Sequence, residues 1–191
     1  MVRRLSSDFS GNSLVMPFSL RIAGLSDSKL LSELGMVCFT EAFSKYNSPE
    51  DLKVFLTETY KEEKIKAELS NNNFLFIIAE DDKREAIGYV KLNRNEMPEE
   101  LAGTRSMQIE RIYVREKIKG KKVGAMLMEK CIAIAQSENY DSIWLGVWQE
   151  NKTAIDFYFK WGFEIFGFKQ FKIGNKVDDD FMMKKDLKDL P

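Results

Sequence analysis

The sequence predicts a single mixed α/β domain, and three observations lead to that prediction. The chain has 191 residues, of which 44% are apolar and 31% charged, as expected for one globular domain with a core of ordinary size. Strand-like and helix-like patterns follow one another as a strand, two or three helices, a β-meander and then β-α-β-α-β-β. Neither an internal repeat nor a long linker divides the chain. We therefore expect one domain over residues 17–191, preceded by a loose arm, residues 1–16, rich in Ser, Gly and Asn.

The first third of the domain contains one predicted strand and three predicted helices. Phe18–Ile22 alternates apolar and polar residues, as a half-buried strand does. Ser26-Asp27 offers an N-cap to a helix that runs to about Phe43. Ser48–Asp51 repeats the start signal, with a Ser cap, Pro at the first helical position and two acids in the first turn. A further helix is expected over about Lys61–Leu69.

Strands dominate the middle of the chain. Phe74–Ala79 is apolar on both faces, and Ala86–Asn93 reads as its hairpin partner. A third strand, Ser106–Val114, leads into a helix predicted from about Gly120 to Glu138, and Ser142–Val147 is again a strand.

A short helix and two strands complete the predicted domain. The helix covers Asn151–Trp161, with Asn151 as its N-cap and Gly162 where a C-cap glycine belongs. The strands are expected near Glu164–Ile173 and Asp179–Met183.

Charge and composition exclude several classes of function. The 29 basic and 30 acidic side chains give a net charge of −1, without the basic excess of a nucleic-acid-binding protein. The chain has no histidine, which excludes a His-dependent triad, a His metal site and a His general base, and its two cysteines form no zinc cluster. We expect Cys38 and Cys131, which lie on predicted apolar helix faces, to be buried free thiols. No apolar run approaches the roughly 18 residues of a membrane span, and a signal-peptide pattern is missing, so a cytoplasmic location is expected.

A glycine-bearing basic loop precedes the helix that follows the third of these central strands. A helix that starts in such a loop presents unsatisfied N–H groups and the positive end of its dipole, which suits a pyrophosphate. A basic surface loop without a ligand is the alternative. The residues of the loop and first turn are Lys119, Gly120, Lys121, Lys122, Val123, Gly124 and Ala125.

The strand before this loop offers a second binding element. A ligand arm that contains amides can pair with the exposed backbone of Ile112 and Val114, as an added strand does. By alternation, Gln108 and Glu110 share one face with Ile112 and Val114, so Glu110 is expected on the side of that arm.

The helix after Asn151 carries an aromatic stripe. Aromatic residues at helical spacing are usually core residues, and we expect this of Phe157 and Trp161. The hydroxyl of Tyr158 needs a partner if it is buried, so Tyr158 is equally consistent with the edge of a site.

These features together resemble the GNAT (Gcn5-related N-acetyltransferase) superfamily. The family signature Gln/Arg-x-x-Gly-x-Gly/Ala corresponds to Lys119–Gly124, and its later Asn…Ala…Phe-Tyr…Gly-Phe segment corresponds to Asn151–Phe163. The resemblance runs from about residue 18 to 187. The segments that are also similar to PaiA-type polyamine acetyltransferases are Asn47–Leu52, Ile112–Val114, Ile143–Trp148, Phe171–Gly174 and Asp180–Lys184.

The resemblance implies a mostly antiparallel central sheet flanked by helices and an N-acetyltransferase that uses acetyl-CoA and no metal. It also implies that Asn151 contacts the pantetheine arm and that Tyr158 protonates the departing thiolate. Lys119 and Lys122 depart from the pattern, since Gln or Arg and Gly are usual there, which puts the affinity for CoA in question. The residues expected to bind acetyl-CoA are Ile112, Tyr113, Val114, Lys119, Gly120, Lys121, Lys122, Val123, Gly124, Ala125, Asn151 and Tyr158.

An amine acceptor with a pKa near ~10 must lose a proton before it attacks, which costs about 4–5 kcal/mol at neutral pH. Without histidine, the base must be a carboxylate, a tyrosine or a water held by one of them. Glu110 is our candidate. The alternative is that Glu110 is a strand carboxylate paired with Arg111 or Arg115, or simply solvated.

The resemblance leaves the acceptor open. A small amine such as a polyamine would favour an acidic mouth, for which the chain offers Glu96, Glu99, Glu100 and the run Asp178–Asp180. A protein N-terminus or a lysine is one alternative acceptor. A CoA-binding regulatory module without turnover is an alternative of another class. Homodimers are frequent in the superfamily, so a homodimer is expected by analogy alone.

Overall fold

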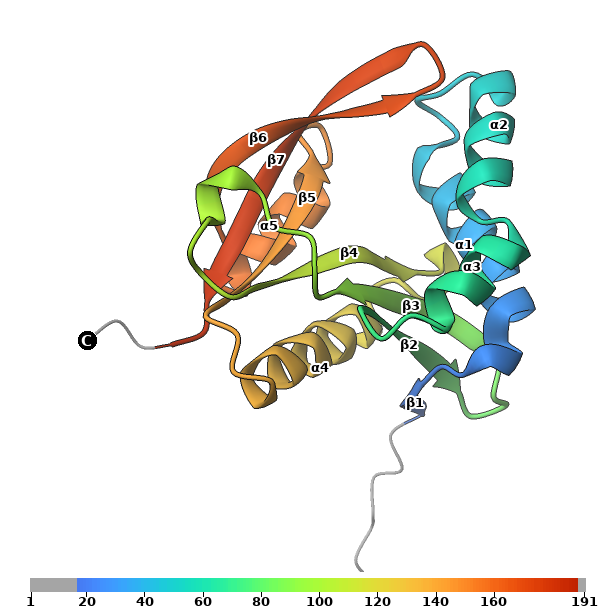
Figure 1. Cartoon of the computed structure of the whole chain (residues 1–191). Helices are drawn as coiled ribbons and strands as arrows, with labels where there is room; N and C mark the ends of the chain where they lie inside the picture. Colours follow the sequence, from blue (N-terminus) through green and yellow to red (C-terminus); the bar gives the residue numbers. More distant parts are fainter. Residues whose placement is uncertain (1–16, 189–191) are drawn as a thin grey trace, which may run out of the picture.

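Figure 1 shows the course of the chain in the computed structural model, which describes residues 17–188. The expected arm, residues 1–16, lies outside the described residues. The helices and strands are β1 (Phe18–Ile22), α1 (Ser28–Phe43), α2 (Pro49–Thr59), α3 (Glu62–Leu69), β2 (Phe74–Asp81), β3 (Ala86–Asn93), β4 (Ser106–Val114), α4 (Val123–Ser137), β5 (Ser142–Trp148), α5 (Lys152–Lys160), β6 (Glu164–Ile173) and β7 (Lys176–Asp186). Short 3₁₀ helices occupy Leu25–Asp27, Glu99–Leu101 and Glu116–Ile118.

One seven-stranded sheet organises the domain, in the order β1-β2-β3-β4-β5-β7-β6. All neighbouring strands run antiparallel except β4 and β5, which run parallel. The prediction of a mixed, mostly antiparallel sheet flanked by helices is therefore confirmed.

Both faces of the sheet are covered. Ile77 and Ala79 of β2 point into the core under α4 and α5, whereas Phe76 and Ile78 point into the core under α1, α2 and α3. This explains why β2 is apolar at every position from Phe74 to Ala79, as the sequence predicted. We call these sides the α4 face and the α1 face.

The element bounds follow the sequence closely, with two informative differences. Helix α4 begins at Val123 rather than near Gly120, because Gly120 (φ 82°) and Lys122 (φ 66°) adopt left-handed conformations that no helix interior accepts. Strand β7 is longer than predicted at both ends, because residues 176–178 pair with β6 and residues 184–186 pair with β5.

The β6–β7 hairpin bends away from the sheet and reaches α2 (Figure 1). Ile173 near its tip is buried in the same cluster as Leu52 of α2, and the rings of Phe171 and Phe55 lie 5.7 Å apart. Gly174, with φ 58°, packs so closely on Asp51 that a side chain has no room there. The hairpin and α2 therefore form an arch over the α1 face.

Strand β4 contains an irregularity beside β3. Lys91 pairs with Arg111 and Leu92 with Ile109, so Glu110 is the extra residue of a β-bulge. The alternation predicted for this strand is therefore wrong beyond the bulge. Ile112 packs into the α4-face core, whereas the carboxylate of Glu110 contacts Lys91 on the α1 face.

Two further expectations concern single features of the described chain. Cys38 and Cys131 are both free and buried, as predicted, and burial raises the pKa of each thiol to about 12. Among residues 17–188, no helix combines the length and the apolarity needed to cross a membrane.

Candidate active site

A gap opens between the two parallel strands at the centre of the sheet. Strands β4 and β5 pair from Ser106 and Ser142 as far as Ile109 and Leu145, and β5 then continues beside β7 alone. Beyond this point the edge of β4 that faced β5 is bare. Ile112 in this part of β4 packs into the α4-face core and Tyr113 into the α1-face core, so the strand borders both faces of the sheet here.

The bare edge of β4 presents backbone groups at alternate residues. Arg115 donates its N–H to the carbonyl of Ile87 on β3, at 2.9 Å. By the alternation of an antiparallel ladder, the N–H and C=O groups of Ile112 and Val114 then point away from β3 and into the gap. The backbone is thus available to an amide-bearing arm. The side chain of Tyr113, by contrast, packs on the α1 face against Tyr89, with ring centroids 5.8 Å apart.

The start of α4 lies at the end of this strand and exposes its first backbone donors. Within residues 17–188, the N–H groups of Lys122, Val123, Gly124 and Ala125 donate to no protein acceptor. Gly124 has open surroundings, since a Cβ there would meet only Phe157 and Val114, at 3.9 Å. These groups fit a pyrophosphate at a helix N-terminus.

The basic side chains of this loop point to solvent. Lys119, Lys121 and Lys122 are exposed, and the ammonium of Lys119 forms an ion pair with Glu116. Lys122 thus keeps its side chain outward while its backbone takes the left-handed conformation (φ 66°, ψ 5°) that explains why glycine is usual there.

We expect Lys122→Gly to raise the free energy of unfolding by up to about 1 kcal/mol. A left-handed conformation costs an L-residue roughly 1–2 kcal/mol, and the greater freedom of glycine in the unfolded chain offsets about half of that. Urea unfolding measures the difference. Lys121→Gly is the matched control, since Lys121 has no positive φ, and it should lower stability. If the Lys122→Gly protein were less stable than wild type, the inference that the backbone of Lys122 is strained would be contradicted.

Tyr158 and Asn151 come from the two ends of the α5 segment. Tyr158 is 7% exposed and packs between the rings of Phe157 and Phe163, in the α4-face core that also takes in Ile112. Burial raises the pKa of its phenol, so the hydroxyl stays protonated at neutral pH. Asn151 caps α5, its Oδ1 accepting the N–H of Ala154 at 3.3 Å, which leaves its amide NH₂ free to donate.

Glu110 lies in a cluster of buried charges on the α1 face. Its Oε1 accepts from the Lys91 ammonium at 2.6 Å and lies 3.3 Å from Arg111, while its Oε2 lies 3.4 Å from the amide of Asn93. Lys91, only 1% exposed, also pairs with Glu68 at 2.9 Å. The pairing with Arg111 that the sequence left open is therefore present. Arg115 instead pairs with Glu41, at 3.0 Å.

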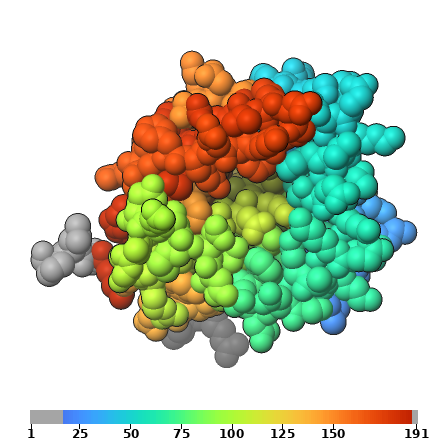
Figure 2. Space-filling view, turned by 45° about the horizontal axis from the view of Figure 1, so that its top comes forward, coloured from blue at the N-terminus to red at the C-terminus, as the bar shows by residue number. Residues whose placement is uncertain are grey.

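Figure 2 shows a hollow on this face of the molecule. The yellow-green of β4 forms its floor, and the red β6–β7 hairpin, the cyan α2 and the light-green segment after β3 surround it. Trp148 of β5 packs beneath the arch against Tyr46, with ring centroids 4.7 Å apart. The hollow therefore leads to the gap from the α1 face, opposite to α4.

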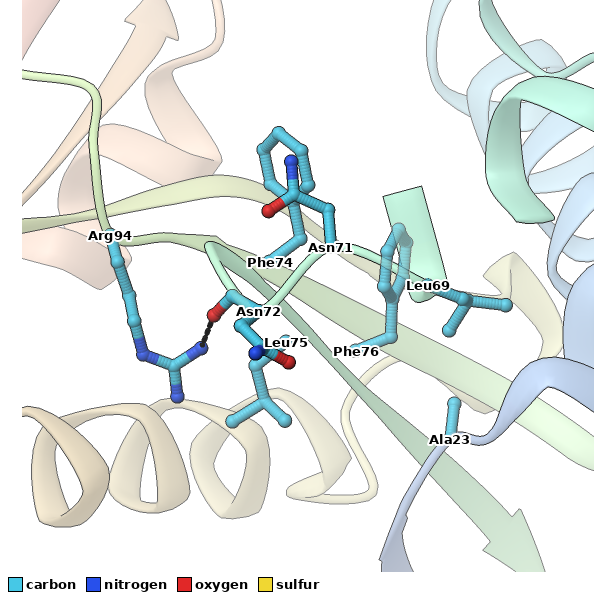
Figure 3. A pocket seen from close by; sticks show the side chains of 8 residues that line it. All are labelled: Ala23, Leu69, Asn71, Asn72, Phe74, Leu75, Phe76 and Arg94. Atoms are coloured by element: carbon cyan, nitrogen blue, oxygen red, sulfur yellow. Dashed lines mark hydrogen bonds between the residues drawn. The ribbon is translucent and has the colours of Figure 1, made fainter. Parts of the chain in front are cut away.

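A separate pocket lies at the start of β2 (Figure 3). Its one charged group, Arg94, binds both carboxylate oxygens of Glu138, at 2.8 and 2.6 Å, and the carbonyl of Asn72 at 2.9 Å. None of the expected site residues lines it. Its lining residues are Ala23, Leu69, Asn71, Asn72, Phe74, Leu75, Phe76 and Arg94.

Comparison with known proteins decides the family. The profile of the acetyltransferase (GNAT) family matches residues 36–163. An uncharacterized N-acetyltransferase (pepI 3′ region) of Lactobacillus delbrueckii subsp. lactis is 33% identical over 149 residues, which cover 78% of this chain and 86% of the relative. The chain belongs to the GNAT acetyltransferase family.

Solved structures agree with this GNAT fold. The PaiA N-acetyltransferase of Thermoplasma acidophilum, in complex with coenzyme A, superposes with a TM-score of 0.71 at 23% identity, covering 90% of this chain and 99% of that one. A spermidine N-acetyltransferase SpeG chimera from Vibrio cholerae and hSSAT superposes with a TM-score of 0.67 at 21% identity, covering 90% and 96%. These structural similarities show that the chain shares its fold with these enzymes.

As a GNAT acetyltransferase, the protein uses acetyl-CoA, which supplies the activated acetyl group as a thioester. The structure brings the sequence-predicted elements together around one gap: the bare edge of β4, the start of α4, and α5 with Asn151 and Tyr158. It does not bring Tyr113 to this site, because the side chain of Tyr113 packs on the α1 face and its carbonyl points toward Gly88 of β3.

Of two charged residues near the gap, Lys91 was missed by the sequence analysis, and Asp180 was named there only as part of an acidic run. Lys91 is the single charge in an otherwise apolar strand segment, and that isolation is a sequence signal for a buried ion pair. Asp180 looked like part of an acidic surface run, yet it is 8% exposed, while its neighbour Asp179 is exposed. The alternation of β7 separates these two residues, and only the pairing of β7 with β5 and β6 reveals it.

Proposed function

We propose that the protein transfers an acetyl group directly from acetyl-CoA to the primary amine of a small cationic acceptor, with a polyamine as the leading class. One observation carries this proposal. The gap between β4 and β5 is bordered by free backbone N–H groups and a bare strand edge on the α4 face and by an arched hollow with acidic residues on the α1 face. Two substrates can therefore enter from opposite faces and meet at the gap.

On the α4 face, the N–H groups at the start of α4 would hold the pyrophosphate of acetyl-CoA, and the exposed lysines of the loop would add positive charge. The backbone of Ile112 and Val114 and the amide of Asn151 would bind the pantetheine arm. A backbone N–H of this strand would polarise the acetyl carbonyl.

At the gap, Glu110 and Tyr158 are the proposed catalytic pair. Tyr158 donates its phenolic proton to the departing thiolate, for which its burial and protonated state are suited. Glu110 meets the acceptor ammonium from the α1 face. It serves either as the base or, since Lys91 and Arg111 hold it, as an anchor for the amine.

The acids around the hollow favour a cationic acceptor. The segment after β3 carries Glu96, Glu99 and Glu100 and packs against β5 and β6, because Trp144 donates its indole N–H to the carbonyl of Glu96 at 3.2 Å. Acidic walls raise the local concentration of a polycation. The arch between α2 and the hairpin limits the width of the hollow, which favours a small amine over a lysine on a folded protein.

The decisive test is a panel of amines incubated with the protein and acetyl-CoA, with free thiol as the readout. We expect thiol release with spermidine or a related polyamine, and none above hydrolysis with folded protein acceptors. Release with N-terminal peptides or lysine peptides alone would contradict the small acceptor. Bound CoA without release for any amine would identify a regulatory module instead.

A further inference from the structure

A second carboxylate, that of Asp180, lies at the gap on the side opposite to Glu110. Asp180 pairs with Trp148 on β5 and with Lys169 on β6. Its Oδ2 lies 3.5 Å from the point where a Cβ of Gly146 would be. Gly146 is the first residue of β5 after the last pair with β4, that between Ile109 and Leu145.

Asp180 and Glu110 therefore flank the gap at the same level. Glu110 is the first residue of β4 after the last pair, as Gly146 is of β5. Trp148, two residues beyond Gly146, packs on Tyr46 on the α1 face, so Gly146 presents the same face and Asp180 lies above it. Glu110 contacts Lys91 on that face as well.

The two carboxylates differ in their partners. Glu110 is tied to two cations. Within residues 17–188, the carboxylate of Asp180 accepts no hydrogen bond and has no cation within 4.0 Å, although it is 8% exposed. The nearest basic neighbour is Lys169, whose ammonium lies 2.8 Å from the same Cβ point of Gly146 and 5.5 Å from the ring centroid of Trp144. The oxygens of Asp180 are not among the fully enclosed atoms without a partner, so they are open to solvent or to a ligand. A mostly buried carboxylate with an open oxygen and no cation partner is a candidate functional group.

The surroundings of Asp180 also set its protonation. Burial raises the pKa of Asp180 to about 6, Lys169 opposes this rise, and the negative charges of Asp178 and Asp179 add to it. Strand β5 contributes no charge beside it, only Gly146 and Trp148. Across the gap, the nearest acid is Glu110. A carboxylate in this range is ionised at neutral pH and is still a stronger proton acceptor than an ordinary aspartate.

We propose that Asp180 is the base that removes the proton from the acceptor ammonium, while Glu110 orients the amine. This inference rests on the proposed function. One N–H proton passes to Asp180, and the freed nitrogen lone pair forms the C–N bond with the acetyl carbon. The C–S bond breaks, and the thiolate takes the proton of Tyr158. The nitrogen loses its second proton, which restores the Tyr158 hydroxyl, and Asp180 releases its proton to water.

The test compares Asp180→Asn with Glu110→Gln and with Asp186→Asn, the matched control, which is exposed at the far end of the same strand beside Ser142. kcat/KM for the acceptor is measured from pH 5 to 9 at saturating acetyl-CoA. Wild type should lose activity below about pH 6, where Asp180 is protonated. Asp180→Asn should lower kcat/KM by about 100-fold and should abolish this loss of activity at low pH, the acid limb of the pH profile. Asp186→Asn should keep both features, and Glu110→Gln should keep the limb while raising KM for the amine. A limb that persists in Asp180→Asn, or that disappears in Glu110→Gln, would overturn the proposal.

A readout without turnover separates this inference from the proposed function. Because the pKa of Asp180 is raised in the folded state, its ionisation destabilises the fold as pH rises from the ordinary aspartate pKa of about 4 to about 6. Asp180→Asn should therefore raise Tm at pH 7.5, raise it less at pH 5 and leave it unchanged at pH 3, whereas Asp186→Asn should raise it at none of these. In the presence of CoA, 1,4-diaminobutane should raise the Tm of wild type but not that of Asp180→Asn. If no amine is acetylated, the proposed function fails. If Asp180→Asn matches wild type in both unfolding measurements, the assignment of Asp180 fails independently.

Discussion

Tyr158→Phe is expected to lower kcat for amine acetylation by about 100-fold or more, with KM for acetyl-CoA nearly unchanged. The phenol is the proposed proton donor to the departing thiolate, and a positioned general acid contributes about 10²–10⁴-fold. Its burial raises its pKa, so the donor stays protonated throughout the neutral range. Steady-state kinetics at saturating amine separate kcat from KM, because an interaction made only in the transition state lowers kcat.

The fold should not respond to this substitution. Among the described residues, the hydroxyl of Tyr158 forms no hydrogen bond, and its ring packs in the core as a phenylalanine would. Tyr140→Phe is the matched control, since Tyr140 is 6% exposed and belongs to the same core but lies beyond the paired end of β5, away from the gap. It should retain full activity. An unchanged kcat in Tyr158→Phe would remove Tyr158 as the acid.

Much of the fold could be predicted because its signals are local. Strands β1, β3, β4 and β6 have the predicted bounds. Apolar periodicity and turn residues are properties of short stretches of sequence, so they can be recognised without knowledge of the fold. The N-cap of α2 was also predicted correctly. The hydroxyl of Ser48 accepts the N–H of Asp51 at 3.1 Å, and Pro49 occupies the first helical position. The α4 start was placed too early, because a left-handed Lys122 has no sequence signal of its own.

The cofactor side of the site was predictable for the same reason. The bare edge of β4, the loop before α4 and the cap of α5 are each contained in one stretch of chain. The acceptor side was not. The bulge at Glu110 reverses the alternation expected for Ile112, and a one-residue irregularity in pairing cannot be read from one strand alone. Asp180 acquires its burial from β5 and β6 together, and this depends on tertiary pairing.

The buried charge cluster beneath the hollow leads to the largest expected effect on stability. Lys91→Met should lower the free energy of unfolding by about 3–5 kcal/mol, the usual cost of breaking a buried ion pair by removing one partner. Lys91 is 1% exposed and contacts Glu68 and Glu110, at 2.9 and 2.6 Å. Met keeps the length of the side chain, so the loss is one of charge rather than of packing. Urea unfolding measures it, with the slope m as a check on two-state behaviour.

A double variant distinguishes charge from packing. Lys91→Met leaves Glu68 and Glu110 to share the single cation Arg111, which lies 3.8 Å from Glu68 and 3.3 Å from Glu110. Adding Glu68→Gln restores neutrality, so the double variant should be more stable than Lys91→Met alone. Lys29→Met is the surface control: Lys29 is 74% exposed and 4.0 Å from Glu33, and its loss should change stability by less than about 0.5 kcal/mol. If Lys91→Met unfolds at the same urea concentration as Lys29→Met, the cluster contributes no stability and its charges serve the acceptor side of the gap alone.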